Sequence, residues 1–316
     1  MKHNVKITAI LIIMFLLTQL IGFFVVKTYN NGLILPYGME PPEEVKENFS
    51  IINILIAFVI AIGLFFLLTK IKAETFIRIW FFAVTSMAIG LTINVVIFLL
   101  IKNFNISLSM VSLIALILAV PLAYFKIFKR NMIVHNMTEL MIYPGIAAVF
   151  VPLINTFGIV ILLLLISIYD IWAVWHSEFM QKMAKYQIEN LKFFTGFFLP
   201  YAEKKEKLKI KQIKDKYLEK GEKVLNNQFK KAKIKINLAI LGGGDVIFPI
   251  IAAGVFYKTY HSIIPSLIIS LFAALALLML FLFAKKKRFY PAMPFLTMGI
   301  YLGMILYYAL ISLNLV

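Results

Sequence analysis

The chain of 316 residues contains no cysteine. This excludes disulfide bonds, thiol nucleophiles and cysteine-ligated metals. Charged residues are scarce as well: Asp, Glu, Lys and Arg make up 15% of the sequence, whereas 62% of the residues are hydrophobic. Soluble domains carry about 25% charged residues. The composition therefore indicates a protein whose surface faces lipid.

Several common catalytic and cofactor-binding motifs are also missing. The four histidines (His3, His135, His176 and His261) form no H-E-x-x-H pair, so a zinc protease has no visible ligand set. The sequence has no G-x-S-x-G elbow, no P-loop and no G-x-G-x-x-G after a strand pattern. We expect neither a metal site nor a cofactor.

Apolar stretches long enough to cross roughly 30 Å of hydrocarbon recur along the whole chain. The first is too long for the apolar core of a signal peptide, and no cleavage site of small residues follows it, so we interpret it as a span. The sequence predicts an all-α polytopic membrane protein with nine transmembrane helices. The predicted spans are 7–26, 51–69, 79–101, 107–125, 136–153, 157–176, 236–257, 263–284 and 291–313.

The distribution of Lys and Arg supports this count and orients the chain. With nine spans, 28 of the 32 basic residues fall on one side of the membrane and 4 on the other. Without the long segment 177–235 the ratio is still 12 to 4. Basic residues concentrate in cytoplasmic loops. We therefore expect a cytoplasmic N-terminus and an outside C-terminus, and the net charge of +17 needs no nucleic-acid partner because these loops face anionic lipid.

The predicted spans divide the chain into three parts: spans one to six in 1–176, a cytoplasmic loop in 177–235, and spans seven to nine in 236–316. The beginning of the loop, 177–198, has apolar residues at loosely helical spacing, which predicts an interfacial helix. The remainder is too charged to bury a core. We interpret it as a solvated, mobile linker, with a regulatory or substrate-guiding loop as the alternative.

Asp170 and Asp245 lie within the predicted sixth and seventh spans. Ionised carboxylates are so unfavourable in hydrocarbon that a functional role is the default interpretation. At 1.5 Å per residue, they lie about 9 Å and about 14 Å from the cytoplasmic ends of their spans, so they could face one another. Two neighbouring carboxylates share one proton. One can then activate water as a general base while the other protonates a peptide carbonyl.

Three glycines, Gly242, Gly243 and Gly244, directly precede Asp245. In mid-membrane each would weaken a helix by roughly 1 kcal/mol relative to alanine and would let another backbone approach closely. We interpret them as access for a peptide substrate. A glycine patch for helix packing is the alternative.

Three short motifs carry a resemblance to a known family. They are Tyr169-Asp170 in the sixth predicted span, Gly242-Gly243-Gly244-Asp245 in the seventh, and Pro291-Ala292-Met293 at the start of the ninth. In that order they resemble the YD, GxGD and PAL motifs of presenilin and signal peptide peptidase, the intramembrane aspartyl proteases. The chain looks most similar to the archaeal presenilin homologues. Met293 stands where the family usually has leucine, a side chain of similar volume.

The resemblance implies a GxGD-type aspartic endopeptidase that hydrolyses peptide bonds within or near transmembrane segments. It implies that Asp170 and Asp245 are catalytic. It also implies single-span transmembrane peptides or signal-peptide remnants as substrates, membrane lipid as surroundings and an archaeal cell membrane as location. An oligomer is possible. We expect no nucleic-acid partner, because the basic tract has few aromatic residues and is interleaved with Glu and Asp. The residues expected to shape the site or bind substrate are Tyr169, Gly242, Gly243, Gly244, Pro291, Ala292 and Met293.

A transmembrane substrate must unwind before its peptide bonds can be reached, and its unwound main chain then needs partners other than lipid. We expect the extended substrate to pair with an edge of the enzyme, near Pro291–Met293 or within the loop 177–235.

A proton- or sodium-coupled transporter or channel is the main alternative, because such proteins also use intramembrane acids and broken helices. No internal repeat is visible, and the acids are confined to adjacent spans. A catalytically silent membrane scaffold is the second alternative. Glu139 is interpreted as interfacial, with a buried carboxylate network as its alternative, and Tyr169 either packs or bonds to Asp170.

Overall fold

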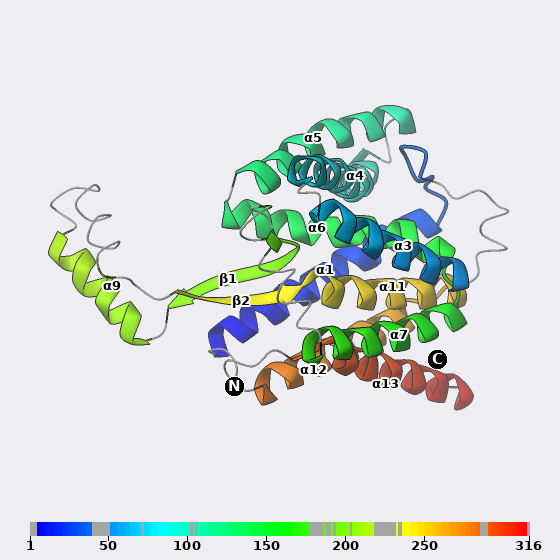
Figure 1. Ribbon diagram of the computed structural model, residues 1–316. Helices are drawn as coiled ribbons and strands as arrows, with labels where there is room; N and C mark the ends of the chain where they lie inside the picture. Colours follow the sequence, from blue (N-terminus) through cyan, green and yellow to red (C-terminus); the bar gives the residue numbers. More distant parts are fainter. Residues whose placement is uncertain are drawn as a thin grey trace. The chain divides into compact units, whose positions relative to one another are not determined.

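Long helices dominate the structure (Figure 1). The computed structural model describes residues 5–39, 51–70, 73–101, 104, 106–129, 131–176, 186–187, 191, 194–202, 204–217, 232, 236–284 and 290–314. Its elements are α1 (Val5–Asn30), α3 (Ile51–Lys70), α4 (Glu74–Ile101), α5 (Leu108–Phe128), α6 (Met132–Phe150), the 3-10 helix η1 (Val151–Leu153), α7 (Thr156–Trp175), β1 (Gly196–Ala202), α9 (Lys204–Tyr217), β2 (Ile236–Gly242), α11 (Gly243–Tyr260), α12 (Ile263–Phe283) and α13 (Met293–Ser312).

Seven helices in the described part of the chain are long and apolar enough to cross a membrane. They are α1, α4, α5, α6 with η1, α7, α12 and α13. The prediction of a mostly helical, polytopic membrane protein is confirmed. The helices α3 and α11 occupy the places of the second and seventh predicted spans, while the count of nine spans stays a prediction.

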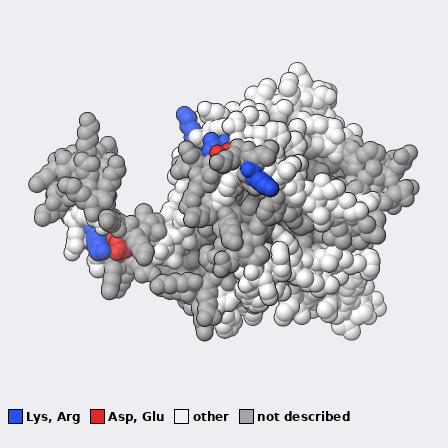
Figure 2. Space-filling model, in the orientation of Figure 1, with Lys and Arg blue, Asp and Glu red and all other residues white. Residues whose placement is uncertain are grey.

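The outer surface of the helices is apolar. Leu100, Phe157 and Phe283, for example, are 74%, 72% and 79% exposed. On the face shown in Figure 2, the described surface carries few charged side chains. An apolar surface of this extent drives association in water but is solvated by hydrocarbon. The surface therefore fits a protein embedded in lipid.

Polar caps determine where several of the helices begin. The side chain of Asn155 accepts a hydrogen bond of 2.7 Å from the Gly158 N–H at the start of α7. Asn131 caps α6 in the same way, and Ser262 caps α12. These side chains satisfy N–H groups that have no partner within the helix. The short polar connections between the apolar runs thus set the helix boundaries.

The helical unit comprises residues 1–197 and 242–316, and α11 lies at its centre. This helix packs against α1, α6, α7, α12 and α13. All its residues from Pro249 to Tyr257 are buried, as in a helix covered on every side. At Gly254 an added Cβ would lie 2.7 Å from the Val151 side chain and 3.0 Å from that of Val26. Small residues therefore let the neighbouring helices close around α11.

Residues 198–241 form a second compact unit. The strands β1 and β2 pair as an antiparallel two-stranded sheet, and α9 follows β1 (Figure 1). The predicted linker thus contains regular structure. Most of the predicted interfacial helix, 177–198, lies outside the described residues.

The predicted seventh span, 236–257, is wrong at its beginning. Residues 236–242 form β2, and α11 begins only at Gly243. The glycine run explains the difference, since glycine is a poor helix former and Gly242 has an extended backbone at the N-cap of α11. The prediction of an all-α chain with uninterrupted spans in 236–316 is corrected accordingly. Asp245 lies in the first helical turn and not deep within a continuous helix.

The contact between α4 and α6 gives a test of this packing. An added Cβ at Gly145 would overlap the main-chain carbonyl of Ala88, which cannot move without shifting α4. We expect Gly145→Ala to lower the stability by about 1–3 kcal/mol, measured as a lower thermal midpoint in detergent. Gly63→Ala is the control, because no atom lies within 4 Å of its added Cβ. Equal midpoints for both variants would contradict the close packing.

Candidate active site

The buried carboxylate of Asp170, on α7, is held by the beginning of α13. Its side-chain oxygen Oδ2 accepts a hydrogen bond of 3.0 Å from the main-chain N–H of Met293. Met293 is the first residue of α13, where the N–H groups have no partner within the helix. Asp170 is 6% exposed, so this donor satisfies an acidic group that lipid could not. The Tyr169-Asp170 motif thus meets the Pro291-Ala292-Met293 motif.

A second polar contact fixes α7 against α13. The Ser167 hydroxyl donates to the Leu163 carbonyl at 2.8 Å, and the Ser167 and Thr297 hydroxyls hydrogen-bond to each other at 2.7 Å. Ser167 precedes Asp170 by one helical turn, and Thr297 follows Met293 by one turn. Both hydroxyls are buried. Sequence reasoning missed both residues. Their spacing was a usable signal, because residues three or four apart share a helix face, and Ser167 and Thr297 stand at this distance from Asp170 and Met293.

Asp245 is the third residue of α11 and is partly buried. Two of the glycines before it have close neighbours. A Cβ added at Gly242 would lie 3.1 Å from the Asp245 Oδ2, and a Cβ added at Gly243 would lie 2.9 Å from the Tyr143 hydroxyl. Gly244 is exposed. The glycines therefore start the helix and make room for neighbouring side chains, whereas the predicted weakening of a mid-membrane helix does not apply.

The two aspartates lie at adjacent ends of neighbouring helices. Asp170 is near the end of α7 and Asp245 near the beginning of α11, and these helices pack against each other. Figure 1 shows the end of α7 and the start of α11 on the same side of the bundle. The N-terminal turn of a helix also stabilises negative charge.

A side chain from α1 bonds to the same turn of α11. The Gln19 amide Nε2 donates a hydrogen bond of 3.0 Å to the carbonyl of Val246, the residue after Asp245. Gln19 is 3% exposed. Sequence reasoning missed Gln19, although an amide in the middle of an apolar run is a signal for an interhelical bond.

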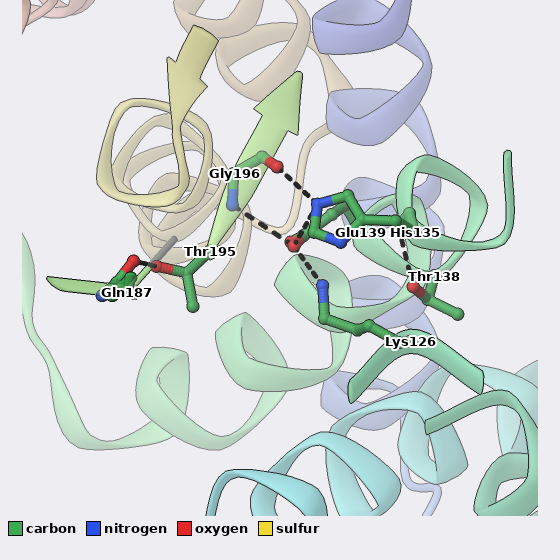
Figure 3. A network of polar contacts seen from close by, with 7 residues as sticks. All are labelled: Lys126, His135, Thr138, Glu139, Gln187, Thr195 and Gly196. Carbon is green, nitrogen blue, oxygen red and sulfur yellow. Dashed lines mark hydrogen bonds and ion pairs between the residues drawn. The ribbon is translucent and has the colours of Figure 1, made fainter. Parts of the chain in front are cut away.

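The interfacial interpretation of Glu139 is wrong. Glu139 is 1% exposed, forms an ion pair with Lys126, and lies 3.3 Å from His135 (Figure 3). The buried network of the alternative exists, but its other members are basic side chains and not carboxylates. Lys126 falls just after the predicted fourth span, 107–125, whereas α5 extends to Phe128 and buries it.

The other predicted residues lie close to Asp170 in the chain or in space. Tyr169 is partly buried, and its ring lies 6.4 Å from that of Trp172. Pro291 is buried and Ala292 is the N-cap of α13. Among the described residues, no group of three His, Asp or Glu side chains is arranged to hold a metal ion.

Comparison with known proteins identifies the family of this chain. The model of the signal-peptide peptidase, presenilin aspartyl protease family matches residues 10–312. The chain belongs to this family. It is an intramembrane aspartyl protease of the presenilin type, as the motifs predict, and nothing in the comparisons supports a transporter or channel. Among curated proteins, none matches the sequence.

Two solved structures of a presenilin family intramembrane aspartate protease resemble this protease in fold. The match to the C222 crystal form has a TM-score of 0.59 at 17% sequence identity. It covers 96% of this chain and 99% of the solved chain. The match to the P2 crystal form has a TM-score of 0.57 at 18% identity and covers 95% of this chain and 96% of the solved chain. At this identity the likeness shows a shared fold.

The hydrogen bond from Gln19 to Val246 can be tested for its effect on the turn of α11 that carries Asp245. We expect Gln19→Leu to lower cleavage about 5-fold, because the loss of one buried hydrogen bond of about 1 kcal/mol loosens the turn that carries Asp245. The neighbouring Thr18→Val is the control, since the Thr18 hydroxyl bonds within its own helix to Met14. Cleavage of a single-span substrate in detergent measures both. A larger loss in the control would count against the role of Gln19.

Proposed function

We propose that Asp170 and Asp245 form the catalytic pair of this protease. One carboxylate takes a proton from water, whose oxygen attacks the peptide carbonyl, while the other gives its proton to the carbonyl oxygen. The tetrahedral intermediate then collapses as the amine leaves with a proton, and no covalent enzyme adduct forms. The observation that carries the proposal is the buried Asp170 carboxylate bound to Met293 at the packed ends of α7, α11 and α13.

The neighbouring motif residues are proposed to shape the site and to make it the GxGD type. Gly242 and Gly243 leave room for the Asp245 carboxylate and for Tyr143, which supports a role in orienting Asp245. The segment from Pro291 to Met293 is proposed to position the substrate as well as Asp170. Tyr169, next to Asp170 on α7, borders the site.

The topology that we propose has nine spans, with α3 and α11 added to the seven apolar helices. The asymmetry of 28 to 4 basic residues supports a cytoplasmic N-terminus and an outside C-terminus. The resemblance to archaeal homologues supports an archaeal cell membrane as the location.

The proposed substrates are single-span transmembrane peptides or signal-peptide remnants, taken up from membrane lipid as an extended chain. The sheet of β1 and β2 supports this mode of binding, because each strand pairs with one neighbour in the described residues and β2 ends three residues before Asp245 in the chain. An added substrate strand would satisfy main-chain groups that unwinding exposes.

The catalytic pair is tested by substitution in the purified, full-length protein. We expect Asp170→Asn and Asp245→Asn each to reduce cleavage of a single-span substrate by at least about 100-fold, because an amide can act neither as a general base toward water nor as a general acid toward the carbonyl oxygen. Asp215→Asn is the matched control, since Asp215 is exposed on α9. Preserved turnover in either of the first two variants, with a thermal midpoint like that of the wild type, would refute the pair.

The binding mode is tested with a substrate whose scissile segment carries ¹³C-labelled carbonyl groups. Bound to the Asp245→Asn variant, these carbonyls should show the infrared amide I frequency of a strand, because an extended segment bonds to a strand edge. The unbound substrate in detergent serves as the helical reference. A helical frequency in the complex would exclude pairing with the sheet.

A further inference from the structure

A cluster of buried charged side chains lies where α5 and α6 meet (Figure 3). Lys126 on α5 and Glu139 on α6 form an ion pair, and their side chains are 3% and 2% exposed. His135 lies one turn before Glu139, 3.3 Å from the same carboxylate oxygen. Removing two charges from water offsets most of their attraction. Stability alone is therefore a weak explanation for this ion pair.

The cluster holds both main-chain groups of Gly196, the first residue of β1. Glu139 Oε1 accepts a hydrogen bond of 3.2 Å from the Gly196 N–H. His135 Nε2 lies 2.8 Å from the Gly196 carbonyl oxygen. Because both neighbours of Nε2 are acceptors, this nitrogen carries the proton and donates it. Gly196 has φ +140°, a conformation that other residues rarely adopt.

The chain at Gly196 is in turn linked by packing to the residues before Asp245. Phe197 is fully buried, and its ring packs edge-on against Tyr143 at 5.8 Å between centroids. The Tyr143 hydroxyl fills the space beside Gly243. Tyr143 lies on α6, one turn after Glu139. A single face of α6 thus contacts both the start of β1 and the start of α11.

A cavity of about 240 Å³ lies between these contacts. Its lining includes Lys126, Glu139, Thr195, Gly243 and Gly244. The charged cluster and the glycines that precede the proposed catalytic aspartate therefore border one space, so a shift of the cluster changes the surroundings of that turn.

We infer that Lys126, His135 and Glu139 are positioning residues for cleavage: they hold Gly196 so that the chain entering β1 keeps a fixed place beside the turn that precedes Asp245. The inference rests on the proposed function, because it takes Asp245 as catalytic. Lys126 keeps Glu139 in place, while Glu139 and His135 bind Gly196. An extended substrate aligned by this chain is presented in one register, so the cluster sets which peptide bond is cut without touching the reacting atoms.

Two double variants separate this role from the stability of the ion pair. Lys126→Met/Glu139→Gln and Lys126→Met/Glu139→Leu both remove the two charges together, so neither leaves a lone buried charge. Only the glutamine retains an acceptor for the Gly196 N–H. We expect the leucine variant to lose about 10-fold in kcat/KM and to shift the cleavage site seen by mass spectrometry. The glutamine variant should restore the rate to within about 3-fold and the wild-type products.

A second pair of variants tests the other bond to Gly196 and leaves the ion pair intact. The side-chain amide of His135→Gln can still donate to the Gly196 carbonyl, whereas His135→Met cannot. We expect an altered product pattern for His135→Met and the wild-type pattern for His135→Gln. If Lys126→Met/Glu139→Leu does not fold, the two His135 variants alone test the positioning role. Identical products for both members of each folded pair would overturn the inference.

Hydrogen–deuterium exchange of the peptide around Gly196 gives a readout that does not depend on cleavage. Exchange should be faster in Lys126→Met/Glu139→Leu than in Lys126→Met/Glu139→Gln, because the N–H loses its acceptor. Equal exchange in the two variants overturns the positioning role even if the protease is active. If instead the wild type cleaves no substrate while exchange differs as expected, the proposed function is refuted, whereas the binding of Gly196 by the cluster is confirmed.

Discussion

Polar side chains inside this helical bundle must bond to other parts of the protein, because lipid offers them no partner. Asp170 is bound by the N–H of Met293, and Gln19 donates to the carbonyl of Val246. Each of these bonds joins helices that are far apart in the chain. The bonds that satisfy the polar groups therefore also fix the rotation and the depth of the helices that carry the proposed catalytic aspartates.

The central position of α11 adds a second constraint. A helix that is buried on all sides has little freedom to move without repacking its five neighbours. Asp245 lies at the one end of this helix where glycines replace bulky side chains. The body of α11 is thus closely packed, and the proposed substrate access lies at its first turn. The charged cluster around Glu139 borders that space from α6.

The sequence predicted the positions of the apolar helices well, because a run of about 20 apolar residues has few interpretations. Asp170 and Asp245 became candidates because a carboxylate has an unfavourable free energy in hydrocarbon, and Pro291–Met293 became candidates from resemblance alone. The start of the seventh span could not be placed, since residues 236–241 are apolar except for Asn237 and have no period that separates strand from helix. Glu139 was misjudged because its partner, Lys126, lies on another helix, and pairing across helices leaves no local pattern.

The bond between Asp170 and Met293 comes from the main chain of Met293 and not from its side chain. Every residue except proline brings the same N–H to this position. Methionine at this position therefore supplies the same bond as the leucine expected from the motif. A pattern that demands leucine at the third residue of the motif would overlook this protease, although its main chain offers the same donor to Asp170.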